Sequence, residues 1–344
     1  MRRKTFALWI VVAVVMSFVD WVVPDVSAPE SPRAAHHLRA GFRNVDPEYR
    51  YPLHVRARHI LRPPAPPRGE PPFVAANDGE ALRTSARAAT MTWVGHSTFL
   101  VQIDGVNVLT DPHWGQRTSP VTFAGPRRLV PPGIRFTDLP RIDAVVISHD
   151  HYDHLDAGTV DRLWRAHRPR FFVPLGIKAW LEARGIENVT ELDWWDSATY
   201  RGLTFICTPA QHSSGRSLTD QNRRLWSSWV LAGESKRMFF AGDTGYYPGL
   251  AEIGRRLGPF GVAALPIGGY SDYRTRHPNH LNPEEAAQVF EEIGASLMVP
   301  MHWGTFDLNR EPFREPPDRL LAAAVQRGIE ERVALPSPGE TIRW

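Results

Sequence analysis

Short runs of apolar, often β-branched residues recur along the middle of the chain and predict β-strands. The first three runs cover residues 89–94, 98–103 and 106–110, and the dipeptide Asp104-Gly105 between the last two is typical of a tight hairpin turn. Because consecutive strands joined by tight turns pair antiparallel, these residues predict one leaf of a β-sandwich.

Beyond residue 140 the pattern changes to alternating strands and helices. An apolar run at 144–147 leads to predicted helices at 157–167 and 177–184, and a later helix is expected to begin at Pro283 with Asn282 as its N-cap. The other strands expected in this part lie at residues 171–174, 189–193, 204–208, 226–231, 238–241, 262–267 and 297–301. Two halves that each mix strands with helices predict an α/β fold, a four-layer αββα sandwich.

Residues 1–28 differ from the rest of the chain and predict a targeting segment. A basic start at 2–4 precedes an apolar run at 5–19, which resumes at 21–23 after one aspartate. A cleaved signal peptide and an uncleaved membrane anchor both fit this pattern. The 19-residue stretch is close to the ~20 residues that span a bilayer, and Pro29 disfavours cleavage, so the anchor is slightly favoured. Both interpretations place the remainder on the exported side of the membrane.

Residues 29–85 form a proline-rich N-terminal arm, in which six of the ten residues from 63 to 72 are proline. This composition predicts an extended linker rather than a packed element. Adjacent His36 and His37 could be metal ligands, but they lack a strand-then-helix context, so a ligand role is not our prediction. The folded domain is expected to begin near residue 86 and to continue to residue 344.

Composition narrows the class of protein. The 344 residues carry a formal net charge of only +3 and contain no basic run interleaved with aromatics, so no nucleic-acid partner is expected. The single cysteine, Cys207, excludes an intramolecular disulfide. Nothing in the sequence sets an oligomeric state.

The main candidate chemistry follows the apolar run at 144–147. Three histidines and an aspartate fall within six residues, at His149, His151, Asp153 and His154. Because side chains alternate on an extended chain, the first three can point the same way. Three more candidates, His212, Asp243 and His302, each follow an apolar strand of the second half. Imidazoles and carboxylates at strand ends predict a site for a divalent cation such as zinc.

The string His-Asp-His-Tyr-Asp-His-Leu-Asp at residues 149–156 resembles the signature of the metallo-β-lactamase fold superfamily. In particular it resembles N-acylphosphatidylethanolamine-hydrolysing phospholipase D and its bacterial relatives. Four other stretches are similar to that family: Trp-Val-Gly-His-Ser-Thr from Trp93, Leu-Thr-Asp-Pro from Leu109, Gly-Asp-Thr-Gly-Tyr from Gly242, and Met-His-Trp-Gly-Thr-Phe from Met301. The resemblance implies that residues 86–344 are a metallo-β-lactamase-like hydrolase domain with the αββα architecture.

The same resemblance implies two Zn²⁺ ions, with manganese or iron as alternatives, and a metal-bound hydroxide as the nucleophile. The two implied ligand sets share a bridging Asp243: His149, His151 and His212 for one ion, and Asp153, His154 and His302 for the other. It also implies catalytic roles for Asp153 and His280, and supporting roles beside the ligands or the substrate for His96 and Asp111.

The function favoured by this resemblance is phosphodiester hydrolysis of phospholipase D type on an N-acylphosphatidylethanolamine-like phospholipid, with the anchor holding the site near the membrane. A lactonase or phosphodiesterase acting on a soluble small molecule is the alternative. A non-enzymatic envelope protein is disfavoured. A structural metal site is closed by ligands around one ion, whereas seven candidate ligands are present here. Asp243, where many β-lactamases carry a cysteine, argues against β-lactam hydrolysis.

Overall fold

The computed structural model describes residues 34–46, 49, 68–84, 88–217, 219–234, 236–270, 277–306, 308 and 311–344. The predicted targeting segment, residues 1–28, lies outside these ranges, as does the part of the arm from 50 to 67. Among the residues inside them, no helix has the length and apolar character needed to cross a bilayer.

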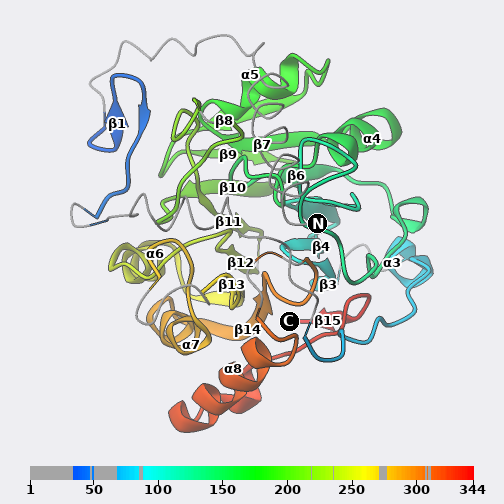
Figure 1. Cartoon of the computed structure of the whole chain (residues 1–344), viewed down its shortest axis with the longest axis vertical. Coiled ribbons are helices and arrows are strands. Elements are labelled where there is room, and N and C mark those ends of the chain that lie inside the picture. The colour runs from blue at the N-terminus through cyan, green and yellow to red at the C-terminus, as the bar shows by residue number, and fades with distance from the viewer. Residues whose placement is uncertain are drawn as a thin grey trace, which may run out of the picture.

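The first sheet runs in the order β15-β3-β4-β5-β6-β7-β8. Its antiparallel part contains the predicted leaf, and its other part is parallel. In chain order its strands are β3 (Thr90–Gly95), β4 (Thr98–Ile103), β5 (Val106–Thr110), β6 (Ala144–Val146), β7 (Arg170–Pro174), β8 (Val189–Leu192) and β15 (Thr341–Arg343). Helices α4 (Ala157–His167) and α5 (Ile177–Glu182) connect the parallel strands and pack on one face of the sheet (Figure 1). A short 3-10 helix, η1 (Phe136–Asp138), precedes β6.

The second sheet runs in the order β14-β13-β12-β11-β10-β9. Its strands are β9 (Ser197–Tyr200), β10 (Leu203–Thr208), β11 (Ser228–Ala232), β12 (Arg237–Phe240), β13 (Phe260–Pro266) and β14 (Ala295–Met301). Its helices are α6 (Gly249–Leu257), α7 (Pro283–Glu292) and α8 (Glu315–Arg327), followed by the 3-10 helix η2 (Glu330–Arg332). Asn282 caps α7 with Pro283 in its first turn, as predicted, because the Asn282 side chain accepts from the Glu285 amide.

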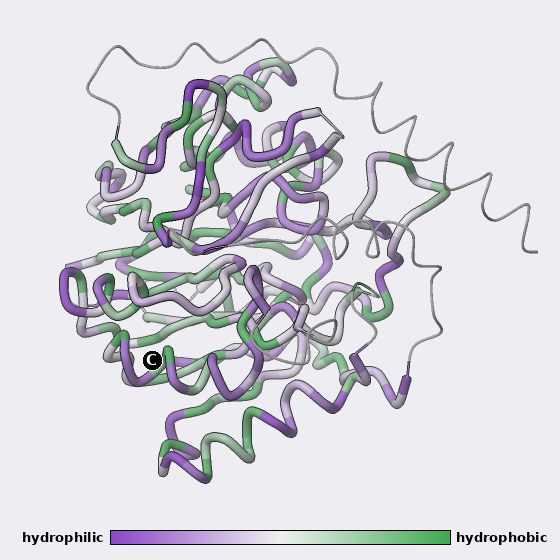
Figure 2. Tube along the Cα trace, turned by 60° about the vertical axis from the view of Figure 1, so that its left-hand side comes forward, coloured by the Kyte–Doolittle hydropathy of each residue, from purple (hydrophilic) through white to green (hydrophobic). Residues whose placement is uncertain are grey.

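The core lies between the two sheets and under the helices on either side. Phe172 of β7 stacks on Phe205 of β10 with ring centroids 3.8 Å apart, so side chains of the two sheets interdigitate directly. Figure 2 shows hydrophobic positions concentrated along the stacked strands. The chain therefore has the metallo-β-lactamase fold, and the predicted four-layer αββα sandwich is confirmed.

Several elements differ from the sequence prediction. Strand β11 begins at Ser228 and not at residue 226. The Trp226 carbonyl accepts from Trp194 Nε1 and the Ser227 amide donates to the Ser148 carbonyl, so these backbone groups are bonded outside the sheet. Elements β9, α6, α8 and β15 were not predicted. The two strands are short and partly exposed at sheet edges, and such residues leave little hydrophobic alternation to read.

Parts of the arm pack on the domain before the expected boundary at residue 86. Strands β1 (His37–Leu38) and β2 (Gly41–Phe42) form a hairpin, and the Phe42 amide donates to the Asn222 carbonyl at 2.8 Å. Gly41 adopts a φ of +108°, and a Cβ there would lie 2.2 Å from the Asn222 oxygen. Further along, α3 (Glu80–Thr84) buries Leu82. These described parts of the arm are therefore packed elements. The linker prediction rested on residues 63–72, of which 63–67 lie outside the described residues.

Candidate metal centre

The structure brings the sequence-predicted site residues together at one end of the sandwich, where strands of both sheets terminate. His96 lies between β3 and β4, Asp111 follows β5, and the cluster at 149–154 follows β6. In the second sheet the candidates follow β10, β12 and β14. Since the carboxyl ends of parallel strands share one edge of a sheet, segments far apart in sequence meet there.

Three imidazoles form the first group of candidate ligands. His149 Nε2 lies 2.9 Å and His212 Nε2 3.2 Å from His151 Nδ1. Burial, reinforced by the neighbouring His154, holds the pKa of His149 well below its usual value, and burial lowers that of His212 to about 3. Neutral imidazoles whose nitrogens converge at such distances present lone pairs to one point, which suits a shared cation.

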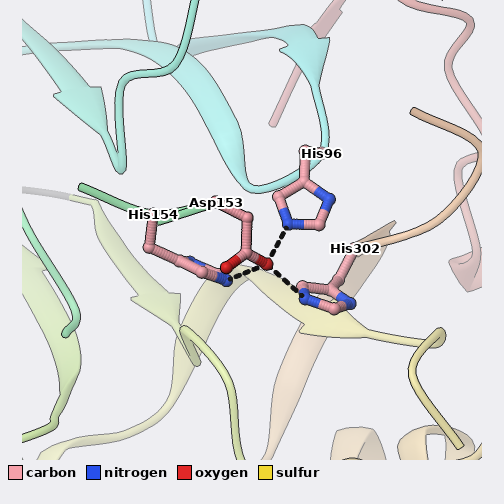
Figure 3. Close-up of side chains that lie close together, drawn as sticks. All are labelled: His96, Asp153, His154 and His302. Atoms are coloured by element: carbon pink, nitrogen blue, oxygen red, sulfur yellow. Dashed lines mark hydrogen bonds and ion pairs between the residues drawn. The ribbon is translucent and has the colours of Figure 1, made fainter. Parts of the chain in front are cut away.

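The second group surrounds the carboxylate of Asp153. Figure 3 shows His96, His154 and His302 arranged around it. Asp153 Oδ2 lies 2.9 Å from His96 Nε2, 3.3 Å from His154 Nε2 and 3.4 Å from His302 Nε2. Asp153 was expected to act both as a ligand and in catalysis, and its carboxylate lies among the other ligand candidates.

Asp243 lies between the two groups. Its Oδ2 is 3.1 Å from His302 Nε2 and 3.2 Å from His154 Nε2 in one group, and 3.8 Å from His212 Nε2 in the other. Its Oδ1 is buried and has no hydrogen-bond partner among the described residues. A carboxylate has lone pairs for two cations, so this placement suits the bridging role that the resemblance implied.

Charge compensation in the second group depends on the carboxylates. Burial alone would lower the pKa of His302, but the adjacent Asp243 and Asp153 carboxylates together outweigh burial and raise the pKa to about 9. Burial would likewise raise the pKa of Asp243, yet His154 and His302 hold it well below its usual value. The carboxylates and imidazoles thus form a buried set of opposite charges. A metal cation in place of the imidazole protons would also neutralise the carboxylates.

Asp111 and Ser148 orient the ligand candidates from behind. Asp111 Oδ2 lies 2.7 Å from His154 Nδ1 and accepts from Ser148 Oγ at 2.6 Å, while Ser148 Oγ lies 2.9 Å from His149 Nδ1. With the Nδ1 atoms so engaged, the Nε2 atoms of His149 and His154 face the centre. The sequence predicted this position for Asp111 but not for Ser148, whose only signal is that it directly precedes the histidine cluster.

Three site residues adopt a left-handed backbone, which is uncommon outside glycine. His96, Asp111 and His302 have φ values of 54°, 34° and 61°. Such conformations cost on the order of 1–3 kcal/mol each and persist where surrounding contacts impose them. Their gathering at one site indicates that the fold trades local backbone stability for side-chain placement.

His280 lies at the edge of the centre, between the two groups. Its Nδ1 is 3.8 Å from Asp243 Oδ2, and its ring centroid is 5.2 Å from that of His212 and 5.3 Å from that of His302. Gly269 permits this position, since a Cβ there would lie 2.7 Å from His280 Nδ1. His280 therefore lies beside the Asp243 carboxylate, and its side chain is still 16% exposed.

Sequence reasoning missed the residues that hold the ligand loop. Arg224 Nη1 donates to Asp150 Oδ2 at 2.8 Å, and Arg216 Nη1 donates to the carbonyls of Asp150 and Leu155 at 2.7 and 2.9 Å. Asp150 was visible inside the motif, but its partners are isolated arginines in a loop without periodicity. Only the folded chain brings them together.

The donor set fits divalent metal ions. His154 Nε2, His302 Nε2 and Asp243 Oδ1 are buried polar atoms without hydrogen-bond partners among the described residues. An unpaired buried polar atom is costly, and a cation at this point would satisfy all three together with the facing imidazoles.

Comparison with known proteins agrees with this chemistry. Residues 106–303 match the model of the β-lactamase superfamily domain. An N-acyl-phosphatidylethanolamine-hydrolyzing phospholipase D of Caenorhabditis elegans is 44% identical over 67% of this chain and 68% of its own length. An uncharacterized protein of Mycobacterium tuberculosis is 42% identical over 91% of this chain and 85% of its own. A solved metallo hydrolase of Ignicoccus hospitalis aligns with a TM-score of 0.58 and 26% identity, over 75% of this chain and 99% of that one.

The chain belongs to the β-lactamase superfamily. It is a metal-dependent hydrolase of the metallo-β-lactamase fold. The candidate metal ligands of this protein are the two groups of side chains described above, the three imidazoles around His151 and the group around Asp153.

Replacing Gly242 tests how closely the two halves of the centre must approach. A Cβ at Gly242 would lie 2.5 Å from the Ser148 Cβ and 3.0 Å from the Ser227 carbonyl oxygen, and the residue has a φ of +56°. We expect Gly242→Ala to displace Asp243 and to reduce bound metal, measured by elemental analysis, by at least about half. The control Gly158→Ala has only ordinary contacts, to Asp156 at 3.9 Å, and should keep its metal. Wild-type metal content in Gly242→Ala would contradict this account.

Proposed function

We propose that the protein is a dinuclear zinc phosphodiesterase of phospholipase D type that cleaves N-acylphosphatidylethanolamine-like phospholipids. The observation that carries the dinuclear part is the position of Asp243 between two groups of buried donors. The choice of a phospholipid is supported by the phospholipase D of Caenorhabditis elegans named above and by a mitochondrial one of Saccharomyces cerevisiae, 35% identical over 73% of this chain and 55% of its own length.

The proposed ligand sets follow the two groups: His149, His151 and His212 would hold one ion, and Asp153, His154 and His302 the other, with Asp243 shared. When bound, such ions supply Lewis acidity and lower the pKa of water towards neutrality. His96, through its contact with Asp153, and Asp111, through its contact with His154, would orient the ligands. His280, next to Asp243, would donate a hydrogen bond to the substrate phosphate or to the leaving group.

We propose a membrane setting for this activity. The predicted anchor at residues 1–28 would keep the domain on the exported side of the membrane, near its substrate. Within the arm, Phe73 exposes 75% of its surface, and an exposed aromatic ring is suited to a membrane interface. A soluble small-molecule ester or diester, hydrolysed without the membrane, is the competing outcome of the lipid assay below.

Two variants in the same centre separate metal binding from catalysis. Asp243→Asn should lower the metal content of the centre from two ions, because the bridging charge is lost. His280→Gln should retain both ions and lower kcat about 10²–10⁴-fold, the range for a positioned proton donor. Elemental analysis and steady-state kinetics on the same preparations measure both effects. An active wild-type protein that holds a single ion would refute the dinuclear assignment, and full activity in His280→Gln would remove its catalytic role.

Substrate class is tested with the full-length protein on N-acylphosphatidylethanolamine vesicles, a soluble phosphodiester and a panel of lactones. We expect phosphatidate release from the vesicles with the highest kcat/KM of the three. Phe73→Ser should lower vesicle turnover several-fold and leave soluble-diester turnover unchanged, because only interfacial contact is lost. Val325→Ser, 64% exposed on α8, is the matched control. Faster turnover of a lactone or of the soluble diester would favour the competing function.

A further inference from the structure

A side chain of the N-terminal arm bonds directly to the backbone of a candidate metal ligand. Asn44 Nδ2 donates to the His212 carbonyl at 2.8 Å, and Asn44 Oδ1 accepts from the His212 amide at 3.0 Å. The carboxamide thus pairs with the polar groups of His212 as a neighbouring strand would. Asn44 is buried, and its Oδ1 also accepts from Trp226 Nε1 at 3.1 Å, which fixes the orientation of the amide.

A second set of contacts connects the arm to the ring of His212 through Asn279. His212 Nδ1 lies 3.0 Å from the Asn279 carbonyl oxygen, a contact that leaves Nε2 facing the centre. The side chain of Asn279 is held in turn by Tyr49, whose hydroxyl donates to Asn279 Oδ1, and by Ser213 Oγ at 3.1 Å. The arm therefore bonds directly to the backbone of this histidine, and it supports the ring only indirectly, through Asn279.

We propose that Asn44 is a positioning residue for His212, so that the arm forms part of the metal centre. The inference rests on the proposed ligand role of His212. Without the two bonds from Asn44, the amide and carbonyl of His212 lose their partners and the segment loses its restraint. Partners behind a metal ligand typically contribute about 10–100-fold to metal affinity. Loss of Asn44 would therefore lower the affinity for the ion held by His149, His151 and His212. The affinity for the other ion would not change.

The experiment titrates chelator against full-length, zinc-loaded Asn44→Ala and the neighbouring control Val45→Ala, which is 55% exposed. In Asn44→Ala one of the two ions of the main centre should leave at about 10–100-fold lower chelator concentration. Val45→Ala should match the wild type in both metal release and melting temperature. Asn44→Asp keeps the acceptor contacts but loses the donor, and it serves as a second variant if the first does not fold.

Unchanged release of both ions in Asn44→Ala would overturn the positioning role, as would a lowered melting temperature of the metal-free form with no change in metal release. These outcomes differ from failure of the proposed function, in which the wild-type protein itself would not hold two ions.

A different cluster joins the same arm to the end of β8. His36 Nε2 lies 2.7 Å from Asp193 Oδ1, and His37 Nε2 lies 2.8 Å from Asp193 Oδ2. The His36 ring stacks on Trp194 at 4.2 Å, and the His37 ring meets Phe42 edge-on at 5.3 Å, so aromatic packing fixes both imidazoles. Two imidazole nitrogens and a carboxylate therefore converge where Asp193 remains 22% exposed.

Independently of the main centre, we infer that His36, His37 and Asp193 bind a further divalent cation of the zinc class, with water completing the coordination. Zinc bonds of about 2.0–2.2 Å place neighbouring donors about 3.3 Å apart, so each imidazole must withdraw by only about half an ångström. The ligands come from segments 157 and 156 residues apart, so the ion would clasp the arm to the domain. Binding would release any protons that the imidazoles carry.

Zinc stoichiometry tests the clasp. After chelator treatment and reloading with Zn²⁺ alone, the double variant His36→Ala/His37→Ala and the single variant Asp193→Asn should each hold one ion fewer than the wild type. His167→Ala, a half-buried histidine at the end of α4, is the control and should lose none. Anomalous scattering at the zinc edge should give a peak between the two rings in wild-type crystals. Equal stoichiometry in all variants, with no such peak, would establish a plain imidazole–carboxylate cluster.

Discussion

The organisation of this protein depends on burying two carboxylates, Asp153 and Asp243, among imidazoles. Removing charges from water is expensive unless opposite charge lies close by, and here the compensation comes from His154 and His302 on one side. Cations can complete that compensation, because several nitrogen and oxygen atoms of the centre have no other partner among the described residues. Both sheets, with their helices, hold these groups within reach of one another.

That placement relies on short, direct links between the sheets. Trp229 Nε1 of β11 donates to the Ile147 carbonyl at 2.9 Å, and the Ser227 amide donates to the Ser148 carbonyl at 2.8 Å. Gly242 allows the Asp243 loop to approach Ser148 without a steric clash. The left-handed backbones of His96, Asp111 and His302 complete the arrangement, since an ordinary strand would direct these side chains elsewhere.

Most strands and all the candidate metal ligands of the main centre could be predicted from the sequence, because the patterns that mark them are local. Apolar runs followed by His or Asp mark strand ends, and strand ends converge by topology, so the candidate ligands could be named before the structure. The helix at Pro283 was predictable for the same reason, since its cap and first turn are adjacent in sequence. Ser148, Asn44 and Asn279 could not be predicted. Each is an ordinary polar residue whose partner is set by packing between segments that no local pattern connects.

The contact between Asn44 and His212 spans 168 residues, and it has a consequence for how the protein matures. The arm is synthesised before every candidate ligand at 149–302, yet its bonding partner appears much later. Closing so long a loop costs entropy that only the assembled domain can offset. The two bonds between Asn44 and His212 can therefore form only after residue 212 has been synthesised. Metal binding that involves His212 would then follow this step, because the unfolded chain contains the candidate ligands but not their arrangement.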